Sequence, residues 1–353
     1  MKKYLVILLL LVVLTGCNKS KKKEEVEKID KANSNINIVT SLEDKISDNT
    51  IWCGTFNLVW NELKENLLKG DAISDPEKEI VTNLNKSTFS KDSLDSNSYY
   101  IKIGKQTFDT KKEIESAINE KFNQKSDILD NFTWEKESNF DFIYAMLYKN
   151  FKFNTPFKKL EDRDFNNDNK KYNYFGITKD TSDGIDQVTV LFYNDNKNNS
   201  VKISTKGNDE IILVKTSNTY NNFLDLYNSI IDNSKNYNGE KSLDDKDTLY
   251  VPYLDFNVYK DFEELKNLTV RSESKEYVIN QAVQSIKLKL NETGGEIKSE
   301  AALSTKETSA VEENKPRYFN YDESFIIFLK EEGKEYPYFA AKIDDLSKFQ
   351  KIQ

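Results

Sequence analysis

Hydrophobic and polar residues alternate regularly near the start of the last third of the chain. Ile286-Lys287-Leu288-Lys289-Leu290 has the period of a half-buried strand, and the turn that follows contains Gly294 and Gly295, which can adopt positive φ. The next segment, Glu296 to Pro316, is rich in Ser, Thr, Ala, Glu and Lys and has no large apolar face. We therefore predict a strand that ends in a turn and continues into a long polar loop.

Two strongly apolar stretches follow this loop. Phe325–Leu329 and Tyr338–Ile343 have the composition of buried strands, and the turn at Glu331–Lys334 joins them as a hairpin. Most connections in compact domains are about 4–6 residues long, and longer ones are usually functional or disordered. The length and position of the polar loop make it the first candidate for a functional segment.

Periodicity upstream predicts two helices and a buried strand. A helix is expected to begin near Asn49 or Thr50, and a second to run from Lys111 to Phe122, with Thr110 and Glu113 as a capping box. Phe140–Tyr148 is apolar at nearly every position, which is typical of a central strand covered on both faces. The apolar stripe of the first helix is formed by Trp52, Phe56, Val59, Trp60, Leu63 and Leu67.

The second half of the chain reads mostly as successive strands. One helix interrupts them, at Phe223–Ile231. The expected strands of this region are Val188–Tyr193, Val201–Ser204, Ile211–Val214 and Val251–Val258.

The N-terminus has the features of a secretion signal. Lys2 and Lys3 precede the apolar run Leu5–Leu14, which is too short for a membrane span of about 20 residues. Leu14-Thr15-Gly16-Cys17 matches the bacterial lipobox. We expect a signal peptide over residues 1–16, lipid attachment at Cys17, a disordered tether over 17–48 and a folded domain over 49–347. These features predict a protein anchored by lipid on the extracytoplasmic face of a bacterial cell membrane.

Composition narrows the chemistry further. The chain of 353 residues contains no histidine, which excludes Ser-His-Asp and Cys-His catalysis, and its net charge of −8 disfavours nucleic acid as a partner. Cys53, in an apolar context, is expected to be buried and unreactive. Asp162, Asp164, Asn166 and Asp168 alternate like the start of a calcium loop, but the required glycine and glutamate are absent, so a solvated turn is the better interpretation. We expect no enzyme activity, metal or cofactor.

Several motifs resemble the serpin family in order and spacing. Asn291-Glu292-Thr293-Gly294-Gly295-Glu296 is similar to the hinge of its reactive-centre loop, and Pro316 to Phe325 is similar to the segment after that loop. Phe140–Phe157, Lys206–Asp209 and Val251–Val258 resemble further family motifs, while the Phe-Ser-Pro-Leu-Ser-Ile signature, which lies beneath the opening of the central sheet, is not found after the first helix. The resemblance implies an α+β fold with a large central sheet, smaller sheets, surrounding helices and an exposed loop.

The resemblance also implies a function for the loop. In inhibitory serpins, a protease cuts the loop, which then inserts as a new strand into the central sheet and carries the acylated protease with it. Counting in twos from Gly295, every charge of this stretch falls on the outward set. The hinge residues are Glu292, Gly294, Gly295 and Glu296, and the inward residues of the inserting loop are Ile297, Ser299, Ala301, Leu303 and Thr305.

The length of the family's loop places the scissile bond at Thr308-Ser309. The resemblance therefore implies a monomeric suicide inhibitor of an extracellular serine or cysteine protease. Bulky and charged residues at Ile297–Glu300 leave a second interpretation open, a binding or adhesion protein on the same scaffold without inhibition. A third, a solute-binding lipoprotein, predicts alternating βα units.

Overall fold

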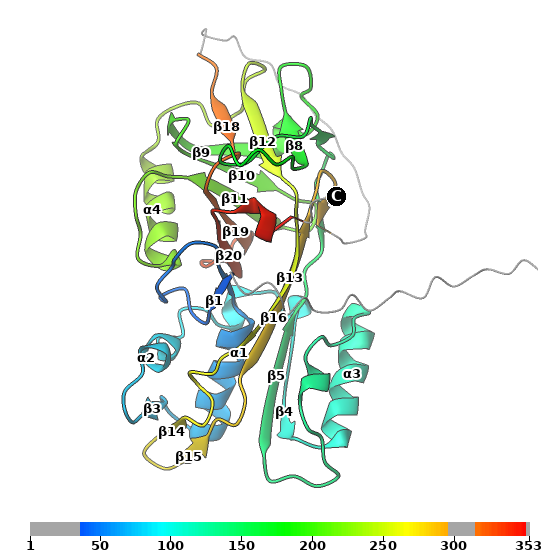
Figure 1. Ribbon diagram of the computed structural model, residues 1–353, viewed down its shortest axis with the longest axis vertical. Helices are drawn as coiled ribbons and strands as arrows, with labels where there is room; N and C mark the ends of the chain where they lie inside the picture. The colour runs from blue at the N-terminus through cyan, green and yellow to red at the C-terminus, as the bar shows by residue number, and fades with distance from the viewer. Residues whose placement is uncertain (1–35, 296–314, 351–353) are drawn as a thin grey trace, which may run out of the picture.

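The computed structural model describes residues 36–295 and 315–350, and its fold is of the α+β class that the sequence predicts (Figure 1). A π-helical turn, Leu63–Leu68, directly extends the first helix. The α-helices of the described part are α1 (Thr55–Glu62), α2 (Glu79–Asn85), α3 (Phe108–Phe122) and α4 (Phe223–Asn236).

The largest sheet is mixed and has seven strands. Its strand order is β1-β2-β20-β19-β11-β10-β9, in which β1 and β2 are parallel and the other neighbours antiparallel. The strands are β1 (Asn37–Val39), β2 (Thr50–Cys53), β9 (Val188–Asp195), β10 (Asn198–Ser204), β11 (Asp209–Lys215), β19 (Phe325–Glu331) and β20 (Phe339–Ile343). The hairpin expected from the apolar stretches near the C-terminus is confirmed as β19–β20, which places the last strands in the middle of this sheet.

Smaller sheets surround the large one. The four-stranded sheet contains β18 (Tyr318–Asn320), β12 (Thr248–Pro252), β8 (Tyr174–Ile177) and β7 (Lys158–Lys159), and the three-stranded sheet contains β15 (Glu276–Val278), β14 (Thr269–Arg271) and β3 (Ile73–Ser74). The strand pairs are β13 (Leu254–Asp261) with β16 (Val283–Leu290), β4 (Tyr99–Lys105) with β5 (Asp141–Leu147), and β17 (Gly294–Gly295) with β6 (Phe151–Lys152).

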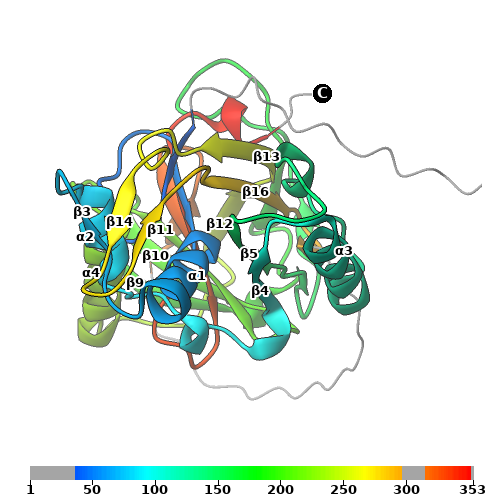
Figure 2. The ribbon, with the colours of Figure 1, turned by 90° about the horizontal axis from the view of Figure 1, so that it is seen from below.

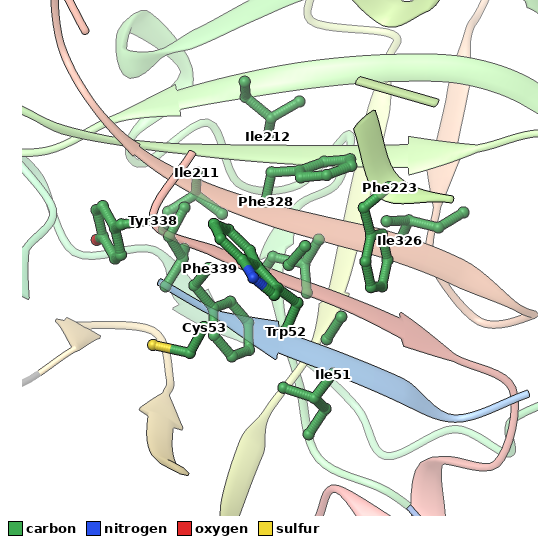
Figure 3. Packing of buried hydrophobic residues seen from close by; sticks show 14 of the residues in the cluster. Ile51, Trp52, Cys53, Ile211, Ile212, Phe223, Ile326, Phe328, Tyr338 and Phe339 are labelled. Carbon is green, nitrogen blue, oxygen red and sulfur yellow. The ribbon is translucent and has the colours of Figure 1, made fainter. Parts of the chain in front are cut away.

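The main hydrophobic core lies against the large sheet, and Trp52 of β2 is fully buried in it (Figure 3). The Trp52 ring packs edge-on against Phe89 with centroids 5.4 Å apart, and its Nε1 donates a hydrogen bond to Oδ1 of Asn57 at 3.1 Å. Phe223, at the start of α4, packs edge-on against Phe328 of β19. The hydrogen bond of the indole and the edge-to-face ring contacts fix the sheet against its neighbouring elements.

A separate, smaller core joins α3 to the β4–β5 pair. Ile114 and Ile118 of α3 are fully buried there, together with Trp134, Phe142 and Tyr144. The helix and the strand pair therefore form a unit with its own apolar contacts beside the main body (Figures 1 and 2).

The first helix begins later than its periodicity predicts. Thr50–Cys53 is the strand β2, all four of its residues are buried, and the helix starts only at Thr55. Hydrogen bonds to β20 and the parallel pairing with β1 hold this segment extended. Trp52 therefore belongs to the sheet and not to the helical stripe, because long-range pairing overrides the local pattern.

Three other local expectations are wrong in detail. The side chain of Thr107, not Thr110, caps α3 and accepts from the Thr110 amide. The Val251–Val258 stretch is divided between β12 and β13 at Tyr253. The stretch Phe140–Tyr148 contains β5, Asp141–Leu147, but this strand is only partly buried and belongs to a two-stranded sheet, not to a central one.

Candidate functional site: a gap between two strand pairs

The strands β5 and β16 face each other across a gap. Each is hydrogen-bonded along one edge only, β5 to β4 and β16 to β13, and within the described residues the other edge has no strand partner. A cavity of about 700 Å³ separates them. An unpaired strand edge presents backbone donors and acceptors that favour the addition of another strand.

The floor of the gap is apolar and comes from α1 and the π-helical turn that extends it. Phe56, Val59, Trp60 and Leu63 line the cavity from the helix side, and Figure 2 shows α1 next to the two strand pairs. Cys53, at the end of β2, and Thr55, at the start of α1, also line the cavity.

Both strands run in the same direction toward one end of the gap. β5 is followed by β6 and β16 by β17, and β6 and β17 pair with each other in antiparallel register. The C-terminal ends of β5 and β16 therefore lie together, at what we call the hinge end of the gap. A chain that turns back at Gly295 and enters the gap runs antiparallel to both strands, the orientation that a short turn allows.

Glu292, Gly294 and Gly295, the expected hinge residues that the structure describes, lie at this end, and backbone hydrogen bonds hold this segment. The Glu292 carbonyl accepts a hydrogen bond from the Phe157 amide at 2.9 Å, and the Thr293 carbonyl accepts one from the Phe153 amide at 3.1 Å. Gly294 has φ of +115°, and a Cβ there would lie 2.4 Å from the Phe151 carbonyl oxygen, so only glycine fits.

Polar groups at the rim of the gap carry charge of both signs. Asp127, after α3, and Lys287, on β16, both line the cavity. Burial raises the pKa of Asp127, while the charge of Lys287 acts in the opposite direction. Gln284 of β16 is buried, and its Oε1 has no hydrogen-bond partner although its Nε2 donates to the Cys53 carbonyl at 3.0 Å. The gap therefore contains an acceptor in need of a donor.

A cluster of buried charged residues lies at the hinge end of the gap. Lys149, just after β5, forms ion pairs with Asp209 of β11 at 3.0 Å and with Glu331 of β19 at 2.8 Å. Lys149 and Tyr338 both line the cavity. Sequence reasoning missed this cluster, because its members are far apart along the chain. The one available signal was a set of charged residues at the ends of strongly apolar strands.

The segment that returns after residue 314 is anchored by Arg317. Its Nη2 lies 2.7 Å from Oδ2 of Asp247, and its Nη1 and Nη2 donate to the carbonyls of Glu240 and Ser242 at 2.6 Å each. Asp247 is 1% exposed, so this ion pair is shielded from solvent. Arg317 was also missed, since a single arginine in a polar stretch gives no sequence signal.

The other residues expected to act fall outside the described residues. These are the lipid-attachment residue Cys17 and the loop residues Glu296, Ile297, Ser299, Ala301, Leu303, Thr305, Thr308 and Ser309. Cys53 is buried as expected, and burial raises the pKa of its thiol. In the described part of the chain there is no cluster of three or more metal-ligating side chains, and no helix has the length and apolar character needed to cross a bilayer.

Comparisons with known proteins return a lipoprotein motif and a set of solved structures. The family profile described as "Prokaryotic membrane lipoprotein lipid attachment site" matches residues 1–18. No curated protein matches in sequence. Among solved structures, the chain is similar to Serpin48 of the insect Tenebrio molitor, with 19% identity, a TM-score of 0.40 and coverage of 67% of this chain and 64% of the other.

Two human structures are also similar. Glycosylated kallistatin matches with 11% identity and a TM-score of 0.44, over 76% of this chain and 70% of the other. Thyroxine-binding globulin, solved in complex with its hormone, matches with 12% identity and a TM-score of 0.40, over 71% and 76%. The match spans less than two thirds of the length of the insect protein. This chain is thus similar to the serpins, the family that its sequence resembles, and it has the lipid attachment motif of a prokaryotic membrane lipoprotein.

Proposed function

We propose that this protein is a suicide inhibitor of an extracellular serine or cysteine protease, held by the Cys17 lipid on the outer face of a bacterial membrane. Cleavage at Thr308-Ser309 frees the loop, and the part that follows Gly295 enters the gap between β5 and β16 as a new strand. The open gap carries this proposal, because two strand edges and an apolar floor face an unfilled cavity of about 700 Å³.

The pattern of the loop matches the walls of this gap. The residues counted as inward (Ile297, Ser299, Ala301, Leu303 and Thr305) are uncharged, and would face the α1 side. The charged residues of the same stretch fall on the other face. A strand in this position is hydrogen-bonded along both edges, and one of its donors can reach the unpartnered Oε1 of Gln284.

Insertion has a measurable energetic signature. A strand of about ten residues that is bonded along both edges adds about twenty backbone hydrogen bonds, since each residue contributes one donor and one acceptor, and each bond stabilises the fold by roughly 1 kcal/mol. For a domain of this size, the sum corresponds to a rise in Tm of roughly 20–30 °C. An uncleaved loop cannot reach this state without releasing the anchor at Arg317, because its far end is fixed by the Asp247 ion pair.

The first test is to cut the loop with a low-specificity protease and to compare the Tm of the protein before and after cleavage. The second is to incubate the protein with serine proteases and to look for adducts that survive SDS. The proposal expects both the rise in Tm and an adduct. Thr305→Arg places a charge on the inward face and should abolish the rise, while Lys306→Arg, one residue further and on the outward face, should leave it unchanged. If the Tm of the wild-type protein is unchanged after cleavage, the proposal is contradicted.

A second candidate is a binding or adhesion protein that uses the same scaffold without inhibition. The bulky stretch Ile297–Glu300 next to the hinge favours it, because a slow entry lets the protease complete hydrolysis. This candidate expects a rise in Tm after cleavage but no adduct, or neither. A solute-binding lipoprotein gains no support, since the large sheet consists of mostly antiparallel neighbours and not of βα units.

A further inference from the structure

Large apolar side chains that the described residues expose gather at one end of the fold. Ile73, Phe108, Phe140 and Val278 are each between 52% and 60% exposed, and they lie at the end of the gap opposite the hinge end, where β4 stops and β5 begins (Figure 1). Tyr318, which is 46% exposed, lies on β18 at the other end. Scattered exposed apolar residues are ordinary, whereas a group of them indicates a contact surface. We call the first four residues the distal patch.

The two phenylalanines of the distal patch belong to segments that are bonded to each other. Phe108 begins α3 just after β4, and Phe140 directly precedes β5. The Gln106 amide donates to the Phe140 carbonyl at 3.0 Å, and the Phe108 amide donates to the Glu135 carbonyl at 2.9 Å. These backbone hydrogen bonds hold both aromatic residues on a fixed part of the surface.

The two aliphatic residues of the patch share the outer face of the three-stranded sheet. Arg271 of β14 lies opposite Ile73 of β3, and Thr269, two residues earlier on β14, lies opposite Val278 of β15. Side chains alternate along a strand, so Ile73 and Val278 point to the same face. Val270 points to the opposite face and is fully buried. The sheet therefore buries one face and exposes Ile73 and Val278 on the other.

The aromatic and the aliphatic halves of the patch flank the gap at this end. Phe140 and Val278 both line its cavity, the first from the β5 side and the second from the β16 side. Figure 2, which views the fold from this end, shows β3 and α3 on opposite sides of β5. The patch thus extends across the end of the molecule.

Charges of both signs surround the patch. Beside Phe140, Lys105 and Asp141 form an ion pair at 2.9 Å. On the three-stranded sheet, Arg271 lies opposite Glu276. A partner of this surface is therefore recognised by apolar contact and not by a net charge, and its binding should persist in high salt.

The chain that precedes the described residues points to this partner. Residues 1–18 match a lipid attachment site, and residues 18–35 separate the expected lipid at Cys17 from the start of the described fold. A stretch of this length spans at most roughly 60 Å. The body of α1 and its π-helical extension, residues 55–68, leads from β2 down to the three-stranded sheet, a distance of roughly 20 Å at about 1.5 Å per residue. The tether is long enough for the distal patch to reach the membrane.

We propose that the distal patch docks on the lipid surface that holds the Cys17 anchor. The lipid retains the protein, and the patch sets its orientation. Because the tether keeps the patch close to the bilayer, a contact that is weak by itself is sufficient. The hinge end and the Arg317 anchor then face away from the membrane, so both ends of the loop are presented to proteases outside the cell. This inference rests on the lipid anchor of the proposed function and not on inhibition.

The test places the full-length lipidated protein on vesicles of phosphatidylethanolamine and phosphatidylglycerol that contain a spin-labelled lipid. A fluorophore is attached at Asn139→Cys, an exposed position next to Phe140, or at Lys246→Cys, an exposed position before β12 at the other end. Cys53 is buried, so the label goes to the new thiol. We expect the spin label to quench the fluorophore at 139 but not at 246, and equally in low and high salt. Equal quenching at the two positions overturns the docking.

Substitutions in the patch make the test specific. Phe108→Ser combined with Phe140→Ser removes two half-exposed rings and should lower the ratio of docked to undocked protein by roughly tenfold to a hundredfold. Val278→Ser, a milder change at a more exposed position, should lower it less. Tyr318→Ser removes an exposed ring at the other end and is the matched control. Quenching at 139 that survives both patch variants, or that Tyr318→Ser also abolishes, contradicts the proposal.

Two other results are distinguishable from docking. If the patch joins two copies of the chain instead, Cys17→Ser protein without vesicles will sediment as a dimer and Phe140→Ser will abolish that dimer, which overturns the membrane as the partner. A cleaved protein without a rise in Tm refutes inhibition and leaves docking in place. Equal quenching at 139 and 246 with a rise in Tm after cleavage does the reverse, and a chain that carries no lipid overturns the anchor and the docking together.

Discussion

The hydroxyl of Tyr253 donates a hydrogen bond to Oε2 of Glu292, and this contact ties the junction of β12 and β13 to the proposed hinge of the loop. Burial, and then the bond to Glu292, raise the pKa of Tyr253, so the phenol remains a donor across the physiological range. The backbone of Tyr253 is itself fixed, because its amide donates to the Asn173 carbonyl at 3.0 Å. The hinge is therefore held by a rigid partner.

Tyr253→Phe removes this bond while keeping the ring. Because the acceptor is a partly exposed carboxylate, we expect a loss of about 1 kcal/mol in the free energy of unfolding and a faster entry of the cut loop. Urea unfolding and the time course of the rise in Tm after cleavage measure the two effects. Tyr318→Phe, at a position that is 46% exposed, is the control and should change stability by less than about 0.5 kcal/mol. Equal losses in the two variants would contradict the role of the hydroxyl.

Gly294→Ala should disrupt the hinge. The backbone there has φ of +115°, and the new methyl group would collide with the Phe151 carbonyl oxygen, so we expect a loss of at least about 2 kcal/mol. Gly333, in the β19–β20 turn, also has positive φ, at +76°, but no atom lies within 4 Å of a Cβ built there. Gly333→Ala should therefore cost only about 1 kcal/mol in chemical denaturation. The difference between the two losses in the free energy of unfolding measures the steric contact at Gly294. Equal losses would exclude close packing at this position.

Arg317→Met should destabilise the far end of the loop strongly. It leaves Asp247 buried and unpaired, and breaking a buried pair on one side typically costs about 3–5 kcal/mol. The double variant with Asp247→Asn should lose less than the sum of the single losses. Each single variant leaves one buried charge without its partner, whereas the double variant removes both charges. A double-mutant cycle from denaturant unfolding gives this coupling. Additive losses would show that the ion pair is not the anchor.

Cys17→Ser should release the protein from the membrane. Residues 1–18 match a lipid attachment site and Cys17 is the cysteine within them, so we expect the modification at this sulfur. Detergent phase partitioning of cell extracts measures it. Cys53→Ser is the control, because Cys53 is the other cysteine of the chain and lies buried in the core. Only the first variant should move to the aqueous phase. A Cys17→Ser chain that stays in the detergent phase would exclude a lipid anchor at this residue.

Local pattern was sufficient for some elements. The spacing of Ile114 and Ile118 predicted α3, and both residues are fully buried in the second core. The alternation in Ile286–Leu290 predicted β16, in which Ile286 and Leu290 are buried and Lys287 and Lys289 are exposed. These patterns are reliable because burial of one face of a helix or strand depends on residues a few positions apart.

The gap, the ion-pair cluster of Lys149 and the anchor of the loop depend instead on residues far apart in the sequence. Lys149, Asp209 and Glu331 meet only because β5 ends where β11 and β19 run side by side. Trp52 sits on a helical stripe in the sequence but in a strand in the fold, since pairing with β20 outweighs local preference. The sequence by itself determined the α+β class, the hairpin, the turn at Gly294 and Gly295 and the lipid motif. The tertiary structure decided which strands pair and which edges stay open, because strand pairing is a long-range choice that no local period encodes.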